Sequence, residues 1–194
     1  LRPDISTCRL VPWYDEPTAQ IIHDAVHQDG ADVTFSSRTV LKSVLALFEE
    51  AGLEPVIAPE LEFFLVKQSS DANAPLITPP GRSGRAEKAR QAYGIDAVNE
   101  FDPLFEEIYD HCDVQGLDID TLSHEAGAAQ MEINFNHGHA LDLADQAFLF
   151  KRTVRQAAIN HHLHATFMAK PIQEQPGSAM HVHVSVKSKE NGKN

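Results

Sequence analysis

Residues 60–65 read Glu-Leu-Glu-Phe-Phe-Leu, and this order separates two kinds of side chain if the segment is a β-strand. Successive side chains of a strand point to opposite faces of the sheet. One face then carries the two leucines and Phe63, which can pack under helices. The other face carries Glu60 and Glu62, whose like charges repel unless a cation lies between them. The segment therefore predicts a sheet with one apolar and one acidic face.

Two later segments repeat this separation. Residues 130–135 read Gln-Met-Glu-Ile-Asn-Phe, so Glu132 lies on a polar face whose other members are amides. Residues 180–186 read Met-His-Val-His-Val-Ser-Val, with the methionine and the valines on a face suited to packing under helices. The opposite face of that segment carries His181, His183 and Ser185. Three strands are thus predicted to combine an apolar face with a face of acids, amides and imidazoles.

Glu125, in the segment Ser123-His124-Glu125, is a fourth candidate carboxylate. A solvated face of an antiparallel sheet is the simple alternative, but the polar positions of the three strands include no Lys or Arg. Carboxylates with a minority of imidazole suit Mg²⁺ or Mn²⁺ better than a structural zinc ion. Four acids exceed the need of one ion, and paired ions of this kind handle phosphoryl groups. We expect Glu60, Glu62, Glu125, Glu132 and His181 to form one pocket for two divalent ions.

Periodicity and turn residues outline the remaining elements. Apolar residues at helical spacing predict helices at about 36–51, where Ser36 or Ser37 is the cap, and 102–115, which begins at Asp102-Pro103; a glycine ends each of them. A third, longer helix is expected at about 140–163. Strands are expected at 56–66, 117–124, 130–136, 165–169 and 180–186. The predicted fold class is α+β, with a mixed, largely antiparallel sheet whose concave polar face is lined by metal ligands and whose other face is covered by helices.

Residues 68–100 have no hydrophobic period and are rich in Ser, Pro and Gly, which predicts a long mobile loop. The loop contains a basic cluster formed by Arg82, Arg85, Lys88 and Arg90. Such a cluster could approach phosphates, although a solvated loop is the favoured interpretation. The sequence holds no glycine-rich phosphate-binding motif.

Composition narrows the function classes. The formal net charge of -12 opposes nucleic-acid binding, and no apolar run approaches the ~20 residues of a membrane span. Two cysteines, Cys8 and Cys112, are too few for a disulfide framework, which favours a reducing, cytoplasmic setting.

Three motifs together resemble the glutamine synthetase family. They are Pro59-Glu60-Leu61-Glu62-Phe63, then Ser123-His124-Glu125 with Gln130-Met131-Glu132-Ile133, and Pro176-Gly177-Ser178-Ala179-Met180-His181-Val182-His183-Val184-Ser185. The resemblance runs from about Pro12 to the end of the chain. The Pro176-Gly177-Ser178 form of the last motif and Arg38-Thr39-Val40-Leu41 look closest to the γ-glutamylpolyamine (glutamate–putrescine) ligases. Departures from the family pattern are Pro176, Ala128-Ala129 and Ala179.

The resemblance implies a role for each matching residue. Glu62, Glu125 and Glu132 match ligands of the metal that orients glutamate. Glu60 and His181 match ligands of the metal that holds the ATP phosphates, and Glu62 and His181 are the candidate catalytic residues. Gly177, with Glu62, matches a contact to glutamate. His183, Ser185, Asp120 and Tyr93 match positions beside the nucleotide.

The resemblance also implies a reaction. In the family, the γ-carboxylate of glutamate attacks the terminal phosphate of ATP, and an amine then displaces phosphate from γ-glutamyl phosphate. The amine would be ammonia or a polyamine, and the protein a ring-shaped homo-oligomer, a dodecamer. Residues 1–194 would be a partial catalytic domain, without the N-terminal domain and the C-terminal part, so we expect little turnover by this chain alone. The alternative is a catalytically inactive relative that uses its sheet for binding or assembly.

Overall fold

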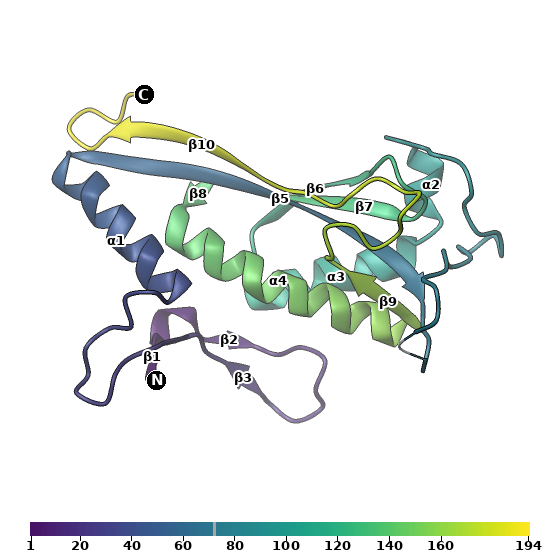
Figure 1. Cartoon of the computed structure of the whole chain (residues 1–194), viewed down its shortest axis with the longest axis horizontal. Helices are drawn as coiled ribbons and strands as arrows, with labels where there is room; N and C mark the ends of the chain where they lie inside the picture. Colours follow the sequence, from purple (N-terminus) through teal and green to yellow (C-terminus); the bar gives the residue numbers. More distant parts are fainter. Residues whose placement is uncertain (72) are drawn as a thin grey trace.

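A computed structural model describes residues 1–71 and 73–194, and in this part of the chain helices cover one side of an antiparallel sheet (Figure 1). The helices are α1 (Ser37–Glu50), α2 (Ile95–Asn99), α3 (Asp102–Gln115), α4 (Ala140–Asn160) and the 3-10 helix Ile5–Thr7. The sheet consists of β5 (Leu53–Lys67), β6 (Ile119–His124), β7 (Gln130–Phe135), β8 (Gly138–His139), β9 (Leu163–Thr166) and β10 (Met180–Ser188). The short strands β1 (Arg2–Pro3), β2 (Arg9–Leu10), β3 (Ala19–Gln20) and β4 (His23–Asp24) form two separate ribbons, β1 with β4 and β2 with β3.

The long strand β5 is the centre of the sheet. β10 pairs with its first half and β9 with its end, while β8 and β7 pair along the other edge and β6 continues beyond β7. Every one of these pairings is antiparallel. The α+β class is confirmed, but the sheet as described is antiparallel throughout rather than mixed.

The apolar face of the sheet packs against α3 and α4, as the period-two pattern predicts. Phe63, Met131 and Ile133 are fully buried there. Helix α3 contributes four apolar side chains at helical spacing to the same core, Leu104, Phe105, Ile108 and Cys112. Burial raises the pKa of the Cys112 thiol to about 12, so this cysteine is unreactive at neutral pH. Because the helices occupy this face, the carboxylates project from the opposite one.

The valine face of β10 corrects one expectation. Met180 and Val182 are each 46% exposed and Val184 is 63% exposed, so this face is not packed under helices. β10 is an edge strand that pairs with β5, whereas α4 and α1 pack against β5 itself. Helix α1 also leaves part of its apolar stripe in solvent, including Val40, Val44 and Leu47. A period-two or helical pattern identifies a face but does not determine what covers it.

Element ends differ slightly from the sequence-based expectation. Helix α4 ends at Asn160 rather than near 163, because His161 caps it and His162 has a left-handed φ of 58°. The segment 68–100 contains the short helix α2 and so is not entirely irregular. Residue 72 of this segment lies outside the described residues, and the mobility of the segment remains a prediction.

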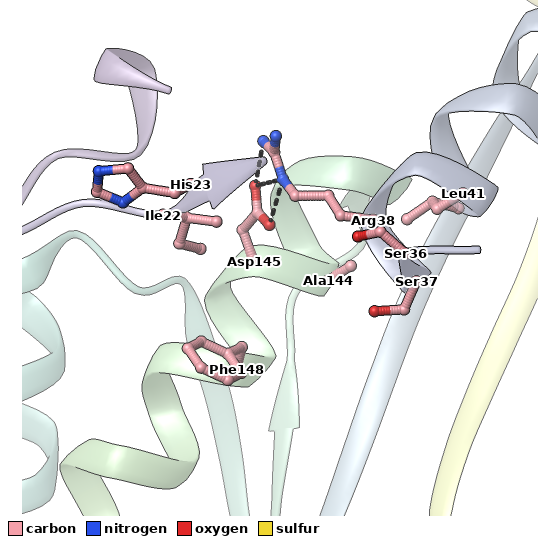
Figure 2. Close-up of a pocket in the computed structure, with 9 residues that line it drawn as sticks. All are labelled: Ile22, His23, Ser36, Ser37, Arg38, Leu41, Ala144, Asp145 and Phe148. Carbon is pink, nitrogen blue, oxygen red and sulfur yellow. Dashed lines mark hydrogen bonds and ion pairs between the residues drawn. The ribbon is translucent and has the colours of Figure 1, made fainter. Parts of the chain in front are cut away.

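Arg38 joins four parts of the chain on the helix side of the sheet. Its guanidinium donates hydrogen bonds to Asp145 of α4, to Asp24 of β4 and to Asp4 near the N-terminus, at 2.6 to 3.2 Å. The hydrogen bond to Asp145 is the main cause that raises the pKa of Arg38 above its usual value. Figure 2 shows the bonds between Arg38 and Asp145, two of the residues that line a cavity of about 520 Å³. None of the five residues predicted for the metal pocket lines this cavity.

Asp24 predicts a measurable acid sensitivity of the fold. Burial alone would raise the pKa of its carboxyl, but hydrogen bonds from Lys42 and Arg38 outweigh burial and lower the pKa from 3.8 to about 2. A carboxyl whose pKa is lower in the folded than in the unfolded chain stabilises the fold at pH values above the pKa of the unfolded chain. This contribution, roughly 2 kcal/mol, is lost as the pH falls from 3.8 through 2. Denaturant unfolding at pH 5 and pH 2 measures the free energy of unfolding of the wild type and of Asp24→Asn. The difference between the two proteins should be smaller at pH 2 than at pH 5 by about this amount. An unchanged difference would contradict the assignment.

Candidate active site

Strand register places the predicted polar residues in two rows across the face of the sheet opposite the helices. His181 of β10 stands opposite Glu60 of β5, and Glu60 stands opposite Asn134 of β7. In the next row, Glu62 of β5 stands opposite Glu132 of β7. Directly opposed like charges destabilise a strand pair, so this arrangement needs a compensating positive charge.

Two groups of candidate ligands form on this face, and they share Glu132. Glu60, Glu132 and His181 have ligand atoms within 4.8 Å of one another, and so do Glu62, Glu125 and Glu132. All five residues predicted for the pocket are therefore brought together. Glu62 and Glu132 are almost fully buried, whereas His181 is exposed.

The electrostatics at Glu132 indicate that the two ligand groups lack a positive charge. Burial is the main cause that raises the pKa of this carboxyl, and the charges of Glu60, Glu125 and Glu62 raise it further. The groups offer carboxylate oxygens and one imidazole nitrogen, the donors that Mg²⁺ and Mn²⁺ accept. A divalent cation in each group would turn the repulsion into attraction, so the residues present fit the predicted ions.

A buried amide orients Glu62. The Gln130 side chain donates a hydrogen bond to Glu62 Oε2 and another to the Gly177 carbonyl, both at 2.9 Å, and it accepts one from the Gly127 N–H at 2.9 Å. The side chain is fully buried. Its position on the polar face was evident from the alternation of its strand, but its connection to Gly177 depends on a contact 47 residues along the chain.

Gly177 lies where a larger residue would not fit. A Cβ at this position would approach the Ala169 carbonyl oxygen to 2.8 Å, which is closer than real Cβ contacts. The Gly177 backbone is therefore held between Ala169 and Gln130, beside Glu62. This places the candidate glutamate contact next to the Glu62 group.

The candidate nucleotide residues are spread more widely. His183 and Ser185 line one shallow cavity of about 230 Å³, together with His137. His183 Nε2 also lies 2.8 Å from Glu60 Oε1, while His181 Nδ1 lies 3.2 Å from Glu60 Oε2. His137 is exposed, and its place in this cavity depends on the pairing of β8 with β5, which the sequence alone does not indicate.

Asp120 and Tyr93 are not in these groups. Asp120 is exposed on β6, where its carboxylate accepts a hydrogen bond from the Thr121 hydroxyl. Tyr93 has a left-handed φ of 60° and an exposed ring, and its N–H donates to the His124 carbonyl at 2.8 Å. The structure places both residues on or beside β6 but does not bring their side chains to the carboxylates.

His124 is buried and paired with a residue that the sequence did not suggest. His124 Nε2 lies 3.0 Å from Glu87 Oε2, and its Nδ1 lies 2.6 Å from the Glu125 carbonyl. Burial lowers the pKa of His124, but the contacts with Glu87 and Glu125 outweigh burial and raise it. Glu87 stands among basic residues in an irregular loop, and no pattern there marked it as buried.

In the part of the chain that the structure describes, none of the helices combines the length and the apolar character that a bilayer span requires.

Comparisons with known proteins show which family the chain resembles. Residues 34–194 match the family model described as glutamine synthetase, catalytic domain. The chain is 37% identical to gamma-glutamylputrescine synthetase PuuA of Escherichia coli, over 92% of this chain and 39% of that protein. It is 36% identical to a glutamine synthetase of Halobacterium salinarum, over 96% of this chain and 40% of that protein.

Solved structures show the same fold. A structure titled GmaS/ADP complex matches with a TM-score of 0.77 at 27% identity, covering 97% of this chain and 41% of that one. A novel glutamine synthase homolog matches with a TM-score of 0.81 at 18% identity, covering 98% of this chain and 42% of that one. The chain thus spans about two fifths of the length of these relatives. From the sequence match and the shared fold together, the chain belongs to the glutamine synthetase family, and residues 34–194 correspond to the catalytic domain of that family.

Proposed function

We propose that the protein is an ATP-dependent glutamate–amine ligase that acts through γ-glutamyl phosphate at a two-metal site. The observation that carries this proposal is the pair of ligand groups that share Glu132 on one face of the sheet. Relatives with 33–37% identity are named glutamine synthetase, gamma-glutamylputrescine synthetase and glutamate–isopropylamine ligase, which supports this reaction class.

In the proposed reaction, the γ-carboxylate of glutamate attacks the terminal phosphorus of ATP, and ADP leaves. The amine then attacks the γ-carbonyl carbon, phosphate leaves, and the amine loses a proton. When bound, Mg²⁺ or Mn²⁺ would neutralise the carboxylate and the triphosphate, which otherwise repel each other, and stabilise the charge of the transition state. Glu62, Glu125 and Glu132 would hold the ion near glutamate, and Glu60 and His181, with Glu132, the ion near the phosphates.

The chain's own residues position the substrates in this proposal. The Gly177 backbone, fixed by Gln130 beside Glu62, would contact glutamate. His183 and Ser185 share a cavity next to Glu60, where a nucleotide could extend from the phosphates. Asp120 and Tyr93 remain proposed nucleotide neighbours. The solved relative titled GmaS/ADP complex supports adenine nucleotide as the co-substrate class.

The amine is proposed to be ammonia or a polyamine, acted on by a ring-shaped, dodecameric homo-oligomer in the cytoplasm. The relatives named for different amines are 37%, 36% and 33% identical to the chain, a span too narrow to select one amine. Phosphate release by the full-length protein with glutamate, ATP and a panel of ammonia, putrescine and ethanolamine would identify the amine. Light scattering of the same sample would give the oligomeric state.

Titration with Mn²⁺ in the presence of ADP tests the site directly. We expect saturable binding of two ions per chain, and loss of the ion near glutamate in Glu62→Ala, because that variant removes one of three ligands. Glu54→Ala is the matched control, since Glu54 lies on the same strand but pairs with Lys187 at 3.4 Å, away from the site. Absence of saturable binding by the wild type would contradict the proposal. Binding of ions and ADP without phosphate release by the full-length protein would favour the inactive relative.

A further inference from the structure

A carboxylate from the irregular segment between β5 and α2 reaches the edge of the candidate site. The Glu87 side chain is only 6% exposed, and Glu87 Oε2 lies 3.0 Å from Nε2 of the fully buried His124. The same oxygen accepts a hydrogen bond from the Ala129 N–H at 2.5 Å. Neighbouring Arg85 and Lys88 are exposed. The Glu87 side chain is thus buried, whereas its charged neighbours in the loop are in solvent.

The two partners of Glu87 lie in or directly before the turn that carries Glu125. This turn, residues 125–130, is closed by a hydrogen bond from the Glu125 N–H to the Gln130 carbonyl at 2.8 Å. His124 precedes the turn, and its Nδ1 contacts the Glu125 carbonyl at 2.6 Å. Glu125 Oε2 itself accepts a bond from the Ala126 N–H at 3.2 Å. The direction of the Glu125 carboxylate therefore follows the path of this backbone.

Ala129 gives a reason why the turn needs an external contact. Its φ of 54° lies in the left-handed region, which disfavours residues that carry a Cβ. The N–H of this strained residue is the group that Glu87 holds, and its carbonyl accepts a bond from the Leu65 N–H at 2.9 Å. The turn keeps its strained conformation because both sides of Ala129 are bonded to other segments.

We propose that Glu87 is a positioning residue for the metal site: by holding His124 and the Ala129 N–H, it fixes the 125–130 turn so that the Glu125 carboxylate meets Glu62 and Glu132. This inference rests on the proposed two-metal function and adds a residue that touches none of the proposed ligands' carboxylates. Residues that orient ligands in this way typically change metal affinity by about 10- to 100-fold when they are replaced.

The test measures each ion separately, using Mn²⁺ and calorimetry. Glu60→Gln leaves the group of Glu62, Glu125 and Glu132 as the remaining site, and Glu62→Gln leaves the group of Glu60, Glu132 and His181. Adding Glu87→Gln should weaken Mn²⁺ binding about 10-fold or more in the Glu60→Gln background. The same addition should change binding less than about twofold in the Glu62→Gln background. Equal affinity with and without Glu87 in the Glu60→Gln background would overturn the proposal.

Glu100→Gln is the matched control. Glu100 Oε2 accepts a hydrogen bond from the Ser83 N–H at 2.9 Å, so it anchors the same loop at a point away from the turn. If Glu87 acts only by ordering the loop, both glutamine variants weaken binding equally, which contradicts a specific role. If it acts through the turn, only Glu87→Gln has the effect, and Ala129→Gly restores part of the affinity because glycine adopts this φ without strain.

Two further outcomes are distinguishable. A wild-type chain that binds no Mn²⁺ contradicts the proposed function, whereas a wild type that binds two ions with an indifferent Glu87→Gln variant contradicts the present inference alone. Thermal melts show whether each variant is folded. A Glu87→Gln chain that stays unfolded even with Ala129→Gly would show that Glu87 maintains the fold instead of the site, and this too counts against the proposal.

Discussion

Glu132→Gln is expected to abolish binding of both divalent cations, whereas Glu60→Gln and Glu125→Gln should each abolish one. The reason is geometric, because Glu132 belongs to both ligand groups and the other two residues belong to one each. Loss of a shared ligand should lower the affinity for each of the two ions by at least about 100-fold, which exceeds the usual effect of replacing residues that only orient ligands. Calorimetric titration with Mn²⁺ gives the number of ions bound by each variant. Retention of one ion at wild-type affinity in Glu132→Gln would show that Glu132 is not shared.

Without metal, Glu132→Gln should not destabilise the protein. Burial and the charges of Glu60, Glu125 and Glu62 raise the pKa of Glu132, so its charged form opposes folding when no cation is present. Removing the charge should leave the melting temperature of the metal-free chain unchanged or higher. Saturating Mn²⁺, at about 100 times its dissociation constant, should stabilise the wild type by about 2.7 kcal/mol per ion and the variant by almost nothing. A site that costs stability until it binds its ligand is typical of functional sites.

Arg38→Ala should destabilise the fold by about 3–5 kcal/mol, because it leaves buried carboxylates without their partner. The side chains of Asp24 and Asp145 are 7% and 11% exposed, and Arg38 bonds both. Lys42 still pairs with Asp24 in the variant, so Asp145 bears most of the cost. Denaturant unfolding at pH 7 measures the loss.

Arg82→Ala is the matched control for this prediction. Arg82 also lies near an aspartate, Asp102, at 3.8 Å, but its side chain is 58% exposed and that of Asp102 is 51% exposed. Exposed ion pairs contribute at most about 1 kcal/mol, so Arg82→Ala should be nearly neutral. If both variants lose the same free energy of unfolding, the burial of Arg38 with its aspartates contributes nothing beyond the ion pairs themselves.

The carboxylate face could be predicted from the sequence because it depends on local geometry. Side chains alternate with period two in any strand, so Glu60 and Glu62 must share a face, and the same holds for His181 and His183. Helices α3 and α4 were also predictable, since their apolar positions recur at helical spacing and Gly116 adopts the left-handed φ of 64° expected after a helix. These features need no knowledge of distant neighbours.

Contacts between distant segments were not predictable in the same way. The Glu87 pairing with His124 joins residues 37 apart, and Arg38 meets Asp145 across 107 residues. Neither pairing follows from a repeat or a spacing, because many acids in this chain could have met either His124 or Arg38. The exposed valines of β10 show the same limit, since their strand has the alternation of a packed strand but lies at the edge of the sheet.

The sequence by itself determined which residue types share a face, where the main helices and strands run, and the family to which the motifs belong. The tertiary structure decided the register that makes Glu132 common to both ligand groups, the hydrogen bonds of Gln130 to Glu62 and of Glu87 to His124, and the face of β10 that stays in solvent. The physical reason is that alternation and helical periodicity are properties of the local backbone. Register, burial and ion pairing between segments arise only when the whole chain folds and distant residues exclude water together.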